Sequence, residues 1–214
     1  MPVARPGGGH RAIVKLQGPD ARAYRQVVAP LTPRIERWLG SGVHANRAMG
    51  RGALTTTRLE PWLETRERWD REIRAIDRGV IVRADVAVFY ASVGERALTR
   101  ALGDDAEGVL RLLRAFWDDG VTGLPVGPEA SAILANAVLA PVDEALRRAG
   151  VAPRRWVDDW VVPVPSRRAG GRTLLTLERA LGDIGLQLNL AKTGLEGPVP
   201  SGRPAPVSAA PAVR

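Results

Sequence analysis

Apolar residues recur every three or four positions between residues 22 and 38, which predicts a helix interrupted near Pro30 and Pro33. We expect a loop at 40–57. Residues 60–76 place apolar side chains at helical spacing among alternating arginine and glutamate, which predicts an amphipathic helix. Its tryptophans, including Trp69, are expected to pack in a core rather than to stack on nucleic-acid bases.

The pattern changes at 80–90, where β-branched and aromatic residues are too dense for an amphipathic helix and predict a buried strand. Helices are expected next at 95–102 and 104–117. A loop at 120–128, which contains glycine and proline, then leads into a longer helix at 129–148 whose apolar residues share one side.

The last third of the chain contains a hairpin signal. Trp156-Val157 and the apolar run 160–162 flank Asp158-Asp159, which predicts two short strands around a tight acidic turn. A final helix is expected at 173–184, followed by a short strand at 186–190. This order of elements predicts an α+β fold in which a sheet carries helices on one face.

The chain has 214 residues, 45% of them hydrophobic and 25% charged, so we expect a globular protein of one domain or a closely joined pair. It has no cysteine and only two histidines, which excludes thiolate metal sites and disfavours an imidazole-bound zinc. No apolar run reaches the roughly 18 residues of a membrane span, and residues 1–9 lack the apolar middle of a secretory signal. We therefore expect a cytoplasmic protein with no membrane partner.

The formal net charge is +8, and arginine supplies nearly all the positive charge because Lys15 and Lys192 are the only lysines. Guanidinium groups suit phosphate oxygens, so the basic excess favours a polyanionic partner such as nucleic acid. A bias in composition would produce the same excess, so charge alone does not decide the partner.

Packing does not explain two acidic features. Asp85 lies within an apolar strand, and Asp158 and Asp159 lie at a hairpin turn. An ionised carboxylate is costly to bury without a cation or hydrogen-bond donors. If the hairpin lies beside the Asp85 strand, the carboxylates converge, and oxygen-only ligation then favours two Mg²⁺ (or Mn²⁺) ions. The alternative is a solvated turn together with one capped aspartate.

Four stretches of this chain, in this order, resemble the motifs of the reverse transcriptase palm, the core of RNA-directed DNA polymerases. They are 82–93, 123–136, 156–159 and 185–193. The resemblance implies a polymerase palm at 80–195, with a ferredoxin-like antiparallel sheet and helices on one face. It further implies a partial helical fingers region at 12–79, no thumb, a flexible N-terminus at 1–11 and a disordered Pro/Ala-rich tail at 196–214.

The resemblance also implies the activity, a nucleotidyltransferase that adds dNTPs to a nucleic-acid or protein primer on an RNA or DNA template. Asp85, Asp158 and Asp159 would be catalytic and would hold the two Mg²⁺ or Mn²⁺ ions. Lys192 would lie near the triphosphate and protonate the leaving pyrophosphate, unless it is a solvated surface charge. Tyr90 would exclude a ribose 2′-hydroxyl, unless it is a core aromatic.

The resemblance implies a set of substrate-binding residues: Phe89, Tyr90, Gly123, Pro125, Gly127 and Ser131. The glycines would allow a close approach to the nucleotide, unless they are simply turn residues. Ser131, together with Asn136, is as well explained by bracing its helix against the sheet as by contact with substrate.

Val126 departs from the family pattern, which has glutamine after Leu-Pro. A loop without that glutamine is similar to the abortive-infection and related phage-defence reverse transcriptases of bacteria, so an associated RNA or second protein is a further partner to consider. The alternative from another class is a non-catalytic palm remnant that binds nucleic acid, or a subunit of a larger polymerase. A palm-fold nucleotide cyclase would share the paired aspartates but would not account for the Leu-Pro-x-Gly loop.

Overall fold

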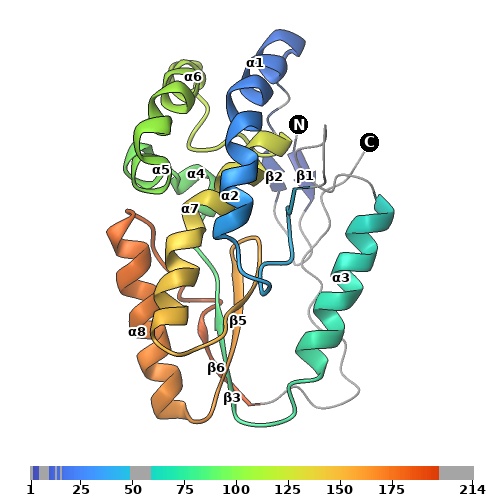
Figure 1. Cartoon of the computed structure of the whole chain (residues 1–214), viewed down its shortest axis with the longest axis vertical. Helices are drawn as coiled ribbons and strands as arrows, with labels where there is room; N and C mark the ends of the chain where they lie inside the picture. The colour runs from blue at the N-terminus through green and yellow to red at the C-terminus, as the bar shows by residue number, and fades with distance from the viewer. Residues whose placement is uncertain (1, 5–9, 13, 15, 49–58, 198–214) are drawn as a thin grey trace.

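The computed structural model describes residues 2–4, 10–12, 14, 16–48 and 59–197. Its centre is a four-stranded antiparallel sheet in the order β4-β5-β3-β6 (Figure 1). The strands are β3 (Val80–Ala84), β4 (Arg154–Trp156), β5 (Asp159–Val164) and β6 (Gly194–Glu196). The predicted α+β fold with an antiparallel sheet is confirmed at this level.

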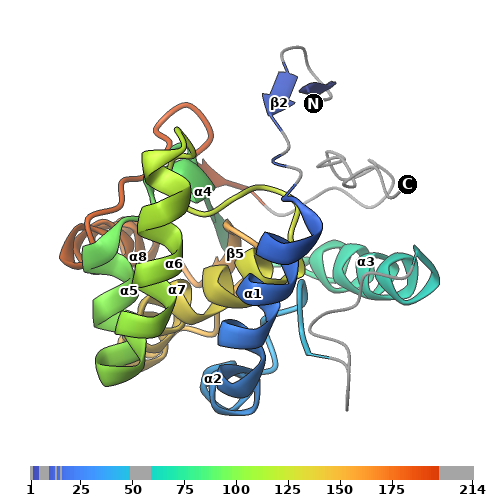
Figure 2. The same cartoon turned by 90° about the horizontal axis from the view of Figure 1, so that it is seen from above.

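Helices α7 (Glu129–Arg148) and α8 (Arg167–Asp183) lie on one face of this sheet, and several shorter helices gather around α7 (Figures 1 and 2). Alternate strand residues such as Val82 and Val162 point into the large core beneath them. The elements around α7 are α1 (Gly18–Val28), η1 (Ala29–Leu31), α2 (Thr32–Trp38), α5 (Glu95–Leu102), η2 (Gly103–Asp105) and α6 (Ala106–Asp118).

Helix α3 (Leu59–Arg74), which belongs to the region expected as fingers, lies on the opposite side of the sheet from α8 in both views (Figures 1 and 2). Trp69 and Ile73 of α3 pack with Ile81 and Val161, the strand residues that point away from the main core. The physical reason is that β3 and β5 are apolar on both faces, so the second face also needs cover.

The strand predicted at 80–90 ends at Ala84, so the prediction is wrong for its second half. The chain reverses at Val88, whose φ of 45° is left-handed, and continues as the short helix α4 (Phe89–Ser92). A run of β-branched and aromatic residues does not reveal this reversal, because residues of that type also fill a tightly packed turn.

The C-terminal elements differ from the prediction in their boundaries. The strand expected at 186–190 is reduced to a single bridge between Leu188 and Val86, and the pairing beside β3 is made instead by β6. Helix α8 begins at Arg167, six residues before the predicted start, because the Ser166 side chain accepts a hydrogen bond from the amide of Ala169.

At the N-terminus, β1 (Pro2–Ala4) and β2 (His10–Ala12) pair as a two-stranded antiparallel hairpin that the sequence pattern did not predict. Most of the Pro/Ala-rich tail expected at 196–214 lies outside the described residues, as do residues 49–57 of the loop expected at 40–57. Among the helices that the structure describes, none has the length and apolar character required to cross a membrane.

Candidate functional site

Asp85 lies directly after β3 and is held by three residues of one C-terminal segment. Its backbone N–H donates to Oγ1 of Thr193 at 3.3 Å, and its carbonyl accepts from the backbone N–H of Asn189 at 2.7 Å. Its carboxylate accepts from the Asn189 amide at 2.8 Å on Oδ2 and from Lys192 Nζ at 3.2 Å on Oδ1. Both oxygens of this nearly buried carboxylate therefore have a donor, one neutral and one cationic.

The acidic hairpin turn reaches the same end of the sheet. Trp156 pairs with Asp159, so Val157 and Asp158 form a two-residue turn between β4 and β5. Ala84, the residue before Asp85, pairs with Trp160, the residue after Asp159. This register brings the predicted catalytic carboxylates Asp85, Asp158 and Asp159 together at one end of the sheet.

The electrostatics of the cluster appear in the pKa of Asp159, which rises from 3.8 to about 7. Burial is the largest cause, followed by the negative charge of Asp158 and by a hydrogen bond to Asp85, while Lys192 acts in the opposite direction. Asp85 and Asp159 thus share the nearby ammonium group of Lys192. The excess negative charge is a reason for this cluster to attract further cations.

The donor chemistry of Asp85, Asp158 and Asp159 is that of a site for Mg²⁺ or Mn²⁺, since all the ligand atoms would be oxygens. In the part of the chain that the structure describes, however, no three carboxylate or imidazole groups are arranged closely enough to form a ready metal site. Lys192 occupies Oδ1 of Asp85, and 63% of its side-chain surface is exposed. A cation that binds Asp85 through Oδ1 would therefore displace a side chain that is free to move outward.

Two left-handed valines lie close in sequence to the carboxylates, Val88 before helix α4 and Val157 in the turn between β4 and β5. Val88 has a φ of 45° and Val157 a φ of 55°, a conformation that costs a β-branched residue on the order of 1–3 kcal/mol. Such strain persists only where the surrounding contacts hold it, and it is concentrated at functional sites. The backbone thus singles out the same edge of the sheet as the carboxylates do.

The loop at 120–128 docks on the turn that carries Phe89 and Tyr90. The backbone N–H of Leu124 donates to the carbonyl of Tyr90 at 2.7 Å, and the Trp117 indole donates to the carbonyl of Gly123 at 2.8 Å. Gly123 has a φ of 61°, and a Cβ at this position would lie 2.1 Å from the Tyr90 carbonyl oxygen. Glycine is therefore required at 123 by the approach of two segments that the sequence places more than 30 residues apart.

The aromatic residues of this turn differ in exposure. Phe89 is buried, whereas Tyr90 is partly exposed, and their rings meet edge to face at a centroid distance of 5.4 Å. Pro125 is buried and Gly127, with a φ of 124°, is exposed. Tyr90 and Gly127 are therefore the members of the predicted substrate-binding set with surface open to solvent on this side.

Ser131 is fully buried in α7, and its hydroxyl lies 3.1 Å from the Tyr24 hydroxyl of α1. Asn136, one and a half turns later, donates its amide to the carbonyls of Ala45 and Asn46 at 3.1 and 3.0 Å. The expected role of bracing the helix against the sheet fits Asn136, whose Oδ1 accepts from Arg155 of β4, whereas Ser131 braces α7 against α1 instead.

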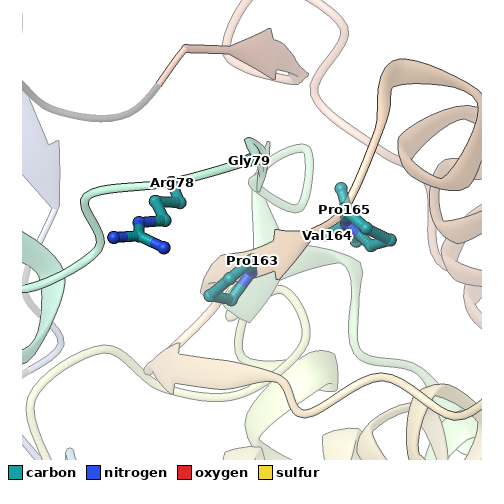
Figure 3. A pocket seen from close by; sticks show the side chains of 5 residues that line it. All are labelled: Arg78, Gly79, Pro163, Val164 and Pro165. Atoms are coloured by element: carbon teal, nitrogen blue, oxygen red, sulfur yellow. The ribbon is translucent and has the colours of Figure 1, made fainter.

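Sequence reasoning assigned no role to Asn189 or Thr193, although both belong to the stretch that carries Lys192. The signal available was their closeness to Lys192 in the sequence. The short segment from Asn189 to Thr193 makes four hydrogen bonds with Asp85, three of them through its own side chains. A separate hollow of about 360 Å³ lies at the other end of β3, against Gly79 and Val164 (Figure 3). It is lined by none of the predicted site residues.

No protein-family model matches the chain, and no curated protein sequence matches it. The resemblance to the reverse transcriptase palm therefore depends on the four motif stretches of the sequence.

Proposed function

We propose that the chain is a reverse transcriptase-like nucleotidyltransferase that adds dNTPs to a nucleic-acid or protein primer. The observation that carries this proposal is the meeting of Asp85, Asp158, Asp159 and Lys192 at one end of the sheet. These residues come from three of the four motif stretches, and the fourth docks on the turn that follows Asp85. Random acidic surface positions would have no reason to converge in this way.

In this proposal Asp85, Asp158 and Asp159 hold divalent cations, two ions in all. Mg²⁺ or Mn²⁺, when bound, activates a primer 3′-hydroxyl and neutralises the triphosphate. The chain's own contribution is the placement of the carboxylates and the largely exposed ammonium of Lys192. Once displaced from Asp85, this ammonium is available to bind phosphate oxygens and to donate a proton to the leaving pyrophosphate.

Tyr90 and the 120–128 loop form the other side of the proposed site. The hydrogen bond from Leu124 holds the backbone carbonyl of Tyr90, five residues after Asp85, against this loop, and the Tyr90 ring is partly exposed. A ring held there excludes a ribose 2′-hydroxyl by contact, which selects deoxynucleotides. The lack of a glutamine at Val126 keeps the phage-defence reverse transcriptases as the branch in which to look for a biological role.

The test is incorporation of labelled dNTPs with Mg²⁺ or Mn²⁺, with and without a primed RNA template. We expect primer extension by the natural chain and none by Asp158→Asn. The matched control is Asp104→Asn, which removes the same charge from an exposed position outside the cluster. Absence of extension by the natural chain under all these conditions, or extension by Asp158→Asn, would overturn the proposal.

A second candidate function is binding of nucleic acid without catalysis. It is favoured by the occupation of both Asp85 oxygens and by the lack of a ready three-carboxylate site among the described residues. The net charge of +8 suits this role equally well. Salt-dependent binding of single-stranded nucleic acid, with a log–log slope of about −0.7 per phosphate neutralised, together with no incorporation would identify this function.

A further inference from the structure

A buried ion pair lies behind the acidic turn, where the hairpin meets α7. Arg155 of β4 donates from Nε to both carboxylate oxygens of Asp143 in α7, at 3.1 and 2.9 Å. Its Nη2 lies 2.8 Å from Oδ2 of the same carboxylate, and the two side chains are only 1% and 2% exposed. The pair is shielded from water, so each buried charge needs the other as its counter-charge.

The second strand of the hairpin ends on the same carboxylate. Trp160 of β5 donates its indole N–H to Oδ1 of Asp143 at 2.8 Å. Arg155 and Trp160 stand directly opposite each other across the two strands, one pair behind the Trp156 and Asp159 pair that closes the turn. Asp143 therefore ties both strands to α7 immediately behind the acidic turn.

Arg155 also reaches the turn itself. Its Nη1 donates to the carbonyl of Val157 at 2.6 Å and to Oδ1 of Asn136 at 3.0 Å. Val157 is the left-handed residue of the turn, in a conformation that a β-branched side chain adopts only when its surroundings hold it. The hydrogen bond from Arg155 therefore holds the carbonyl of this strained residue in place.

We propose that Asp143 and Arg155 are positioning residues, which hold the turn against α7 so that Asp158 and Asp159 meet Asp85. That the carboxylates bind metal rests on the function proposed above, but the role of Asp143 and Arg155 in locating the turn does not. The ion pair carries no net charge, so it acts on the location of the turn more than on the field around it. Two apolar side chains of similar volume would fill the same space but would not fix the direction of the Val157 carbonyl.

The test compares Asp143→Asn, which leaves Arg155 without its counter-charge, with Val138→Ala, a buried apolar truncation on the same helix. The first measurement is amide hydrogen exchange of residues 156–160, expressed relative to the amides of β3. We expect at least a tenfold increase at the turn in Asp143→Asn and less than a twofold increase in the control. Equal increases in both variants would overturn the proposal, because they would indicate a merely structural role.

The second measurement is the binding of Mn²⁺ alone, followed by paramagnetic broadening. Loss of a residue that orients the ligands weakens a metal site by about 10–100-fold, so we expect that loss in Asp143→Asn and none in the control. If the natural chain binds no Mn²⁺, the proposed function fails, and hydrogen exchange at the turn still decides the positioning role.

Trp160→Phe keeps the ion pair and removes one donor to Asp143, so it provides a milder variant if Asp143→Asn does not fold. It should raise exchange at the turn about threefold relative to β3, by an amount between those of the two other variants. An unchanged turn in Trp160→Phe would contradict the role assigned to Asp143.

Discussion

The structure contains two aspartate–cation pairs near the same end of the sheet, and they are built in opposite ways. Arg155 and Asp143 are both nearly inaccessible, and the arginine makes further hydrogen bonds to Asn136 and Val157. In the pair of Lys192 with Asp85, the lysine is 63% exposed and makes one contact of 3.2 Å. The first pair is suited to fixing a position and the second to exchanging its cation.

The largest difference between the pairs is expected in stability. Arg155→Met leaves Asp143 buried without its counter-charge, which should lower the free energy of unfolding by about 3–5 kcal/mol. Urea denaturation at pH 7 measures this loss. A change below about 1 kcal/mol would mean that Arg155 resembles a surface ion pair and would remove the contrast with Lys192.

The carboxylate cluster should make the metal-free protein less stable as the pH rises. The folded-state pKa of Asp159, about 7, lies above its usual value of 3.8, so its contribution to stability is present below pH 4 and is lost as the pH rises through 7. We expect a loss on the order of 2 kcal/mol between these pH values from this group.

Urea denaturation of the natural chain and of Asp159→Asn, from pH 4 to pH 8, isolates this contribution. The two curves should converge toward pH 4, and the variant should be the more stable protein at pH 8. Parallel curves would show that the pKa of Asp159 is not raised in the folded protein. The cluster would then not differ in this respect from the Arg155–Asp143 pair, which carries no net charge.

Tyr90 extends the comparison to the exchangeable side of the site. If its ring limits the sugar, Tyr90→Ala should reduce discrimination against ribonucleotides at least tenfold, which corresponds to about 1.4 kcal/mol. Single-nucleotide extension with dNTP and with rNTP measures this ratio. Unchanged selectivity in an active variant would assign Tyr90 to packing against Phe89.

The smallest effect on stability is expected from Lys192→Met. A largely exposed ion pair contributes about 0–1 kcal/mol, so urea denaturation should show little change. The same substitution should raise the pKa of Asp159 further, because Lys192 lowers it in the natural chain. Carboxyl-carbon NMR detects that increase, and a lower pKa in the variant would contradict the shared-cation description of the cluster.

Sequence patterns predicted α5 and α7 to the residue, because their apolar periodicity and their flanking glycine and proline are local signals. They also predicted the acidic hairpin, but with its turn at Asp158-Asp159 and not at Val157-Asp158, and the approach of this hairpin to Asp85 was one of two alternatives. The left-handed reversal at Val88 was not predictable, since valine favours extended backbone and the close approach of Gly123 to Tyr90 just after it is a tertiary contact.

The partner of a buried charge is the least predictable feature. Asp143 stands among apolar residues of α7, which marks it as a polar group in need of partners. Its pairing with Arg155 and Trp160, however, depends on the register of β4 with β5 and on how the hairpin lies across the helix. Those are tertiary relations that no local window of sequence contains.

The short strand β6 protects one edge of the sheet. It covers the second edge of β3, where Val82 faces Leu195 and the Arg83 guanidinium meets Glu196 at 2.6 Å. Without these three residues, the apolar strand β3 would present a row of unpaired peptide groups to other molecules, a template for aggregation. The residues after Lys192 thus protect the molecule from self-association while they anchor the segment that reaches Asp85.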